Sequence, residues 1–267
     1  MSEPRRSGVV HARPPLLERL NAWRKRSFFS PYWLDWMHLR GSVERCAEHA
    51  SGLLLDVGTA ESPYAELFAP HVSRYLGLEY PPSILDKLPE LWSMLDRAGR
   101  TVDVFGDGNR LPFGDGTLDT VLSTEVLEHV PRPRQCIGEM GRVLKPGGTL
   151  ILTVPFLQPL HELPSDYYRY TPSSLRDLAT AAGLEVVSVE PRGNFAAAVG
   201  ALTVQYLLRT LGAKELQSDG SVLPSAWRNV LLAPAYATVQ LTAHLLSKLS
   251  NDSAVALGYA LIARKPG

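Results

Sequence analysis

LLLDVGTAES, residues 53–62, is the stretch that decides the fold. It opens with an apolar run of the kind that forms a buried strand and reaches Asp56 near the end of that run. Gly58, Thr59 and Ala60 follow as small residues, which allow the backbone to turn sharply and approach a ligand closely. A helix after such a turn offers free N–H groups to the ligand. The stretch therefore predicts a strand–turn–helix unit with a binding site at the turn, although an ordinary junction has the same local pattern.

Apolar runs and helix-period stretches alternate from about residue 52 to residue 190. This alternation is typical of βαβ units and predicts an α/β fold with a doubly wound, seven-stranded sheet. Helices are expected over Arg134–Lys145 and from the N-cap Thr171 to Gly183. The expected strands are Leu53–Val57, Arg74–Glu79, Thr101–Phe105, Leu118–Ser123, Thr149–Val154, Leu184–Glu190 and Gly258–Lys265.

Two segments exceed the needs of a minimal doubly wound domain. The first includes FFSPYWLDWMHLR (28–40) and predicts a basic and aromatic helical cap over the carboxyl edge of the sheet. The second predicts an apolar helical insert before the last strand. The expected parts are the cap at 1–50, the sheet domain at 51–191 plus 256–267, and the insert at 192–255.

The insert contains the apolar runs FAAAVGALTVQYLL (195–208) and VLLAPAYATVQLTAHLL (230–246). Each is shorter than the roughly 20 residues of a spanning helix, and Pro234 interrupts the second, so we expect neither to cross a membrane. Three alternatives stay open: an extra helical layer, contact with a second subunit, and peripheral contact with a membrane. Basic residues flank the runs and suit an anionic surface: Arg192, Arg209, Arg228 and Lys248.

Composition excludes several classes of partner. The 27 basic and 27 acidic residues give a formal net charge of zero, so no global field attracts nucleic acid. Cys46 and Cys136 are too few for a disulfide framework or a thiolate metal site. The N-terminal stretch lacks the apolar run of a secretory signal. We expect a cytoplasmic protein, with possible peripheral attachment at the inner face of the membrane as the alternative.

Acidic residues follow successive strands of the expected sheet. Glu79 ends the second strand, where a carboxylate can accept the two hydroxyls of a ribose. Asp107 follows the third strand and can accept a hydrogen bond from an adenine amine. Glu125 follows the fourth strand. Because these strand ends meet at one edge, the series predicts a site for a nucleoside that bears a cationic group.

Five segments together resemble the type 11 group of class I S-adenosylmethionine-dependent methyltransferases: LDVGTAESPY, GLEY, GDGNRLPF, LDTVLSTEVLEHV and GEMGRVLKPGGTLILTVP. The resemblance covers about residues 50–190 and the final strand, and it implies a Rossmann-like methyltransferase sheet with S-adenosylmethionine as cofactor. It implies that Asp56 and Gly58 lie at the methionine part of that cofactor. The cofactor-binding residues that we expect are Asp56, Gly58, Thr59, Ala60, Glu79, Tyr80, Asp107, Gly108, Asn109, Thr124 and Glu125.

The turn departs from the family pattern, because Ala60 and Ser62 stand where glycines are usual. Both are small, so we expect an altered turn geometry and a preserved site. A nicotinamide-binding enzyme could use Glu79 equally well, but it would need G-x-G-x-x-G after the first strand and would have no use for Asp107.

Candidate catalytic residues lie in LDTVLSTEVLEHV (118–130) and in HELPSDYYRYT (161–171). A hydroxyl acceptor must lose a proton, and histidine is the usual base near neutral pH. His161 is the first candidate base, with His129 and Tyr167 as further catalytic candidates. The E-x-x-E-H pattern also resembles the divalent-metal site of some quinone-pathway and small-RNA methyltransferases. Its possible ligands are Glu125, Glu128, His129 and His161, but a metal is not favoured.

The function expected from these residues is O-methylation of a small-molecule, glycan or lipid-linked hydroxyl. The alternatives are a non-catalytic cofactor-binding or interaction module and a metal-dependent quinone-type O-methyltransferase. Neutral charge and the absence of N-P-P-Y disfavour a nucleic-acid methyltransferase. The oligomeric state is not predicted.

Overall fold

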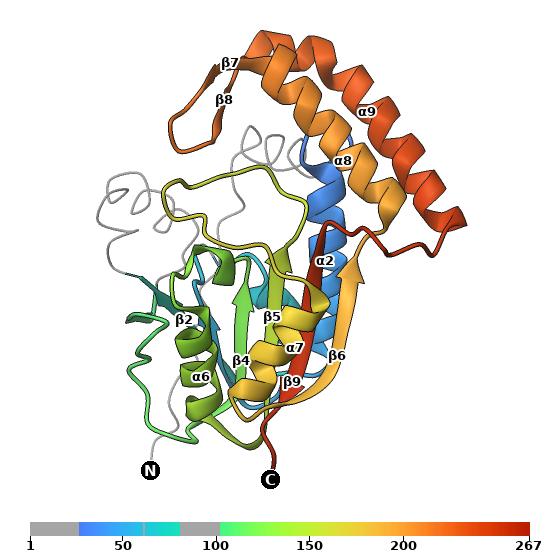
Figure 1. The fold of residues 1–267 in the computed structure, drawn as a ribbon. Coiled ribbons are helices and arrows are strands. Elements are labelled where there is room, and N and C mark those ends of the chain that lie inside the picture. Colours follow the sequence, from blue (N-terminus) through green and yellow to red (C-terminus); the bar gives the residue numbers. More distant parts are fainter. Residues whose placement is uncertain (1–26, 61, 81–101) are drawn as a thin grey trace, which may run out of the picture.

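Seven strands form the central sheet of the protein (Figure 1). The computed structural model describes residues 27–60, 62–80 and 102–267. The strands are β1 (Leu53–Val57), β2 (Arg74–Glu79), β3 (Val104–Phe105), β4 (Leu118–Thr124), β5 (Leu144–Pro155), β6 (Glu185–Arg192) and β9 (Gly258–Arg264). Their order is β3-β2-β1-β4-β5-β9-β6, and β9 runs antiparallel to both of its neighbours. The predicted doubly wound α/β sheet is thereby confirmed.

Apolar side chains of alternating strand positions cover the two faces of the sheet. Leu54 and Leu122 face the helices α2 (Trp33–Ala47) and α3 (Ala65–Phe68). Leu55 and Val121 face the helices α6 (Pro133–Val143) and α7 (Pro172–Ala181) on the other side. Successive strand residues point to opposite faces, so strands buried on both faces read as continuous apolar runs.

The parallel strands bring the candidate residues to one edge of the sheet. Asp56 of β1 is aligned with Gly77 of β2 and with Leu122 of β4. Glu79 at the end of β2 is aligned with Phe105 at the end of β3. The short helix η1 (Leu127–His129) follows β4 at the same edge. Sequence-distant acidic groups therefore meet around the carboxyl ends of the strands.

Several predicted boundaries need correction. The third strand is shorter than expected and begins at Val104, while Thr101 lies outside the described residues. The strand expected at Thr149–Val154 begins at Leu144, where KPGG is already part of an extended segment. The Thr171 N-cap is confirmed, because its side chain accepts a hydrogen bond from the N–H of Ser174.

Helix α2 covers a face of the sheet and does not only cap its edge. Val43 and Cys46 are buried against the sheet, because the apolar positions of this helix follow a helical period. Only the first turn of α2, with Leu34 and Asp35, reaches the carboxyl edge, where Leu34 packs against the insert. Residues 1–26 of the expected cap lie outside the described residues.

The insert forms a helical hairpin beyond the carboxyl edge (Figure 1). The expectation that its apolar runs are too short to span a membrane is wrong, because Phe195–Gly212 and Ala226–Leu249 are both long and apolar enough by length and composition. Pro234 does not interrupt the second helix, because it lies on the exposed side, where water can satisfy the freed carbonyl. The elements are α8 (Phe195–Leu207), η2 (Leu208–Gly212), β7 (Ala213–Leu216), β8 (Val222–Pro224) and α9 (Ala226–Leu249).

Candidate functional site

The turn after β1 requires glycine at one position. Gly58 has φ of 79°, and a Cβ placed there would lie 2.4 Å from Cγ2 of Val126. Ala60 and Ser62 also adopt the left-handed backbone, with φ of 43° and 50°. These two residues thus hold a conformation that favours glycine, at a cost in strain.

Asp56 is a buried carboxyl directly before this turn. It accepts a hydrogen bond from the hydroxyl of Tyr75, while its second oxygen has no hydrogen-bond partner among the described residues. Burial raises the pKa of Asp56 to about 6. A buried oxygen without a partner is costly, and a ligand that donates a hydrogen bond would relieve that cost.

Glu79 joins the end of β2 to the same turn. One carboxylate oxygen accepts from the N–H of Ala60 at 2.9 Å, and the other accepts from the N–H of Tyr80 at 2.8 Å. The carbonyl of Leu78 accepts from the N–H groups of Gly58 and Thr59. The predicted residues of the turn after β1 are therefore in direct contact with the end of β2.

Asp107 lies in a tight turn after β3. Its carboxylate accepts from the backbone N–H of Asn109 at 2.8 Å and from the side-chain amide of Asn109 at 2.9 Å. Gly108 packs closely against Cys136, because a Cβ there would lie 3.1 Å from the sulfur. The side-chain oxygen of Asn109 is buried and has no hydrogen-bond partner among the described residues. The turn thus fixes Asp107 at the edge where it was predicted.

The loop after β4 contacts the turn after β1 and leads into the candidate residues Glu128 and His129. Glu125 has φ of 54°, and its N–H donates to the carbonyl of Thr153 at 3.0 Å. Val126 packs on Gly58, so Thr124 and Glu125 lie beside the predicted cofactor turn. A change in this loop would therefore affect both the predicted cofactor turn and the candidate residues Glu128 and His129.

A buried guanidinium group lies at the end of β6. The side chain of Arg192 is 0% exposed and pairs with Glu125 at 2.9 Å. Burial raises the pKa of Glu125 and of Asp35, although the charge of Arg192 opposes the shift in both. Two carboxyl groups thus share one buried cation, and burial together with the repulsion between them favours the protonated form of one.

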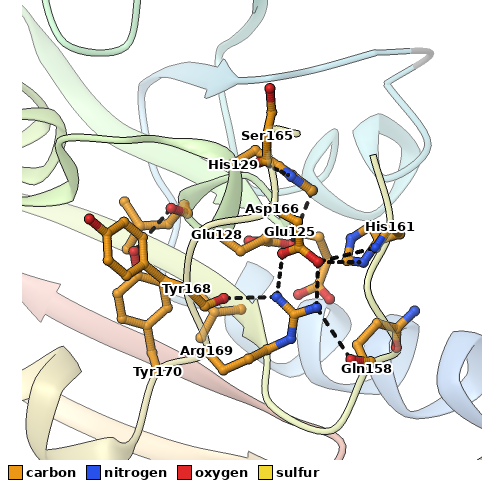
Figure 2. Close-up of polar contacts among 12 residues, drawn as sticks. Glu125, Glu128, His129, Gln158, His161, Ser165, Asp166, Tyr168, Arg169 and Tyr170 are labelled. Carbon is orange, nitrogen blue, oxygen red and sulfur yellow. Dashed lines mark hydrogen bonds and ion pairs between the residues drawn. The ribbon is translucent and has the colours of Figure 1, made fainter. Parts of the chain in front are cut away.

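Glu128, His129 and His161 form a second cluster beside this pair (Figure 2). Ligand atoms of the three residues lie within 4.8 Å of one another. Both carboxylate oxygens of Glu128 are buried and have no hydrogen-bond partner among the described residues. Burial raises the pKa of Glu128 well above its usual value, and the charge of Glu125 adds to the shift.

The two imidazoles are oriented by backbone carbonyls. Nδ1 of His129 lies 2.8 Å from the carbonyl of Ser165, and Nδ1 of His161 lies 3.0 Å from the carbonyl of Pro159. Because a carbonyl only accepts, each Nδ1 donates its proton in these bonds, and in the neutral ring each Nε2 then has a lone pair. The tautomers that result suit either a base or a metal ligand.

Asp166 and Arg169 hold the loop that contains His161. Asp166 accepts from the N–H of His161 at 3.1 Å and from Nη2 of Arg169 at 2.8 Å (Figure 2). Burial alone would raise the pKa of Asp166, but these hydrogen bonds outweigh it and lower the pKa. The resulting carboxylate lies 3.5 Å from Nδ1 of His161 and would stabilise a positive charge on that ring.

Tyr167 lies at the margin of the cluster. Its backbone N–H donates to the carbonyl of Glu128 at 2.9 Å, and its side chain is 47% exposed. Its ring contacts that of Tyr168 at a centroid distance of 6.2 Å. A catalytic role for Tyr167 stays a prediction.

Two important residues of the site were missed at the level of sequence. Arg192 was considered only as a flank of the insert, and Asp35 only as part of the aromatic segment. The signal for Arg192 was a charged residue shortly after the sixth expected strand, at the edge where ligands bind. The approach of Asp35 from α2 has no comparable sequence signal.

The sheet has one antiparallel strand next to its edge, and acidic residues lie at the ends of β1 and β2 and beyond β3. This combination defines a class I S-adenosylmethionine-dependent methyltransferase fold. The family described as "Methyltransferase domain" matches residues 55–152, the segment from β1 to β5. The chain therefore contains a methyltransferase domain of this class, and the predicted resemblance is confirmed.

Known proteins agree with this assignment. An uncharacterized methyltransferase of Mycobacterium leprae is 38% identical over 119 residues, which cover 43% of each chain. The match thus spans less than half the length of that relative. A chain from the complex of the Haloferax volcanii Trm112 methyltransferase activator with a methyltransferase has a TM-score of 0.51 and 18% identity, over 94% of this chain and 95% of that chain. Phosphoethanolamine N-methyltransferase 2 of Haemonchus contortus, solved with S-adenosyl-L-methionine, has a TM-score of 0.51 and 16% identity, over 92% of this chain and 60% of that chain.

Proposed function

We propose that this protein transfers a methyl group from S-adenosylmethionine to a hydroxyl oxygen of a small-molecule, glycan or lipid-linked acceptor. The observation that supports it best is the meeting of Asp56, Glu79 and Asp107 around the turn at Gly58. The unpartnered oxygen of Asp56 and the exposed end of Glu79 fit a cofactor with an amine and a ribose. When bound, that cofactor would supply an electrophilic methyl group on a sulfonium.

The chain's own residues would prepare the acceptor. In this proposal Nε2 of His161 accepts the hydroxyl proton, and the carboxylate of Asp166 stabilises the imidazolium that forms. Arg169 holds Asp166 and thereby the loop. Alignment of donor and acceptor contributes most of the remaining rate enhancement, because methyl transfer is an in-line displacement.

His161→Ala tests this role. Turnover to S-adenosylhomocysteine in a cell extract should fall by roughly 10²–10⁴-fold, while affinity for S-adenosylmethionine in calorimetry stays unchanged. His71→Ala, which removes an exposed histidine away from the cluster, is the matched control and should turn over normally. Normal turnover by His161→Ala would remove this residue from the mechanism. Cofactor binding without any turnover by the unaltered protein would favour the non-catalytic module.

A metal-dependent reaction is the second candidate, and the cluster of Glu128, His129 and His161 favours it. Metal-ligating histidines commonly donate the other ring N–H to a carbonyl, as both imidazoles do here. Two imidazoles and a carboxylate suit Mn²⁺ or Zn²⁺ better than Mg²⁺. Glu125, the fourth candidate ligand, pairs with Arg192 and is not part of this group. Loss of turnover on chelation and its return with Mn²⁺ would support this candidate, and insensitivity to chelator would exclude it.

A further inference from the structure

The exposed sides of α8 and α9 present many large apolar side chains. On α8 the exposed residues recur with helical spacing at Phe195, Val199, Leu202 and Tyr206. On α9 Leu231 is 70% exposed and Leu249 is 82% exposed. Solvated helices rarely present such stripes, so these faces indicate an interaction surface. This surface, called here the hairpin face, consists of Phe195, Val199, Leu202, Tyr206, Trp227, Val230, Leu231, Leu241, Leu245, Leu246 and Leu249.

The inner side of the hairpin is already covered by the domain. Gly200 and Ala243 bring the two helices into close contact, because a Cβ on Gly200 would lie 2.3 Å from that of Ala243. Gln240, in the middle of α9, donates to the carbonyls of Phe28 and Ser30. The hairpin therefore rests on the body of the protein along one side, while most residues of α9 stay exposed. The polar contacts of Gln240 with the chain near Phe28 suit a hairpin that lies on a membrane better than a pair of spanning helices.

The charges of the hairpin indicate the chemistry of its partner. Neither Phe195–Gly212 nor Ala226–Leu249 contains an Asp or Glu. The charged residues in these helices are all cationic: Arg209, Arg228 and Lys248. Apolar helices whose own charges are all cationic are complementary to an anionic lipid surface, although the exposed Asp252 lies beside Phe195 at one end of the hairpin face.

The position of the hairpin relates this surface to the candidate site. The carbonyl of Asp219, between β7 and β8, accepts from the N–H of Leu163 at 2.9 Å. Leu163 lies two residues after His161, in the loop that Asp166 and Arg169 hold. The β7–β8 segment that joins α8 and η2 to α9 therefore links the two helices to the loop of the proposed base.

We propose that the hairpin face docks on the surface of an anionic lipid bilayer. Trp227, which is 64% exposed, and Tyr206 are of the type that gathers at membrane interfaces, and the guanidinium of Arg228 lies over the Trp227 ring at 5.4 Å. A second copy of the chain is a poorer occupant, because the two helices have no carboxylate to pair with the facing Arg228 and Lys248. Docking goes beyond the proposed reaction and does not depend on it.

Vesicle flotation tests the proposal. The full chain should float with phosphatidylcholine vesicles that contain phosphatidylglycerol, less at high salt, and only weakly with phosphatidylcholine alone. The triple variant Leu231→Gln/Leu245→Gln/Leu249→Gln should lower partitioning by at least about tenfold, because each leucine loses apolar contact with lipid.

A matched control replaces three exposed threonines of the same helices. Thr203→Gln/Thr210→Gln/Thr242→Gln should float like the unaltered chain. Thermal unfolding and calorimetry with S-adenosylmethionine verify the fold of both variants. The proposal is overturned if the unaltered chain never floats, or if the leucine variant floats equally well. A dimer in light scattering that the leucine variant dissociates, without flotation of the unaltered chain, would assign the face to a second copy.

Discussion

At the scale of residues, the positions that sequence patterns could predict are those at the ends of strands. Asp56, Gly58, Glu79 and Asp107 were assigned from strand ends and motifs, and the structure brings the residues of the first two strands into direct contact. Arg192 could not be paired with Glu125 in advance, because 67 residues separate them and only the position of β6 in the sheet brings them together.

Gly58 provides the sharpest test at this scale. Gly58→Ala should lower the free energy of unfolding by roughly 2–4 kcal/mol, because a left-handed backbone and a clash with Val126 both oppose the new Cβ. It should also weaken cofactor binding. Gly138→Ala is the matched control in α6, where a Cβ has open space, and should raise the same free energy by roughly 0.5–1 kcal/mol. Denaturant unfolding measures both, and equal effects of the two substitutions would contradict the required turn.

At the scale of elements, buried strands were predictable and the surface of the insert was not. The bounds of β1 and β2 agree with prediction because both are short and have a buried, mainly apolar centre. The second apolar run is shorter than its helix, because residues 226–229 and 247–249 extend α9 beyond the run at both ends. Hydrophobic content alone could not show that one side of α9 is buried against α8 and α2 while the other is exposed.

Gln240 should be the main polar link between α9 and the start of the described chain. It is fully buried, accepts from the N–H of Leu34 and donates to the carbonyls of Phe28 and Ser30. Gln240→Leu should lower the free energy of unfolding by roughly 2–4 kcal/mol, because three backbone groups lose their partner. The control Gln205→Leu, at a half-buried position on α8, should change it by less than about 0.5 kcal/mol. A similar small change for both variants would show that this link contributes little.

At the scale of the whole molecule, the sheet brings the predicted cofactor residues to one edge, and the insert lies beyond that edge beside the loop of His161 (Figure 1). The family pattern could predict that the cofactor residues lie at one edge, because these residues belong to the matched segment 55–152. The family pattern could not predict the place of the insert, because the insert lies outside the matched segment. Its contact with the loop of His161 depends on the backbone of Leu163 and Asp219.

Titration calorimetry with S-adenosylmethionine tests the central claim most directly. The unaltered chain should bind, and Glu79→Ala and Asp107→Ala should each weaken binding by about 10- to 150-fold, because each removes a charge-assisted hydrogen bond. Asp177→Ala, which removes an exposed carboxylate on α7, should bind as the unaltered chain does. No binding by the unaltered chain, or equal affinity for all four proteins, would contradict the assignment of the cofactor site.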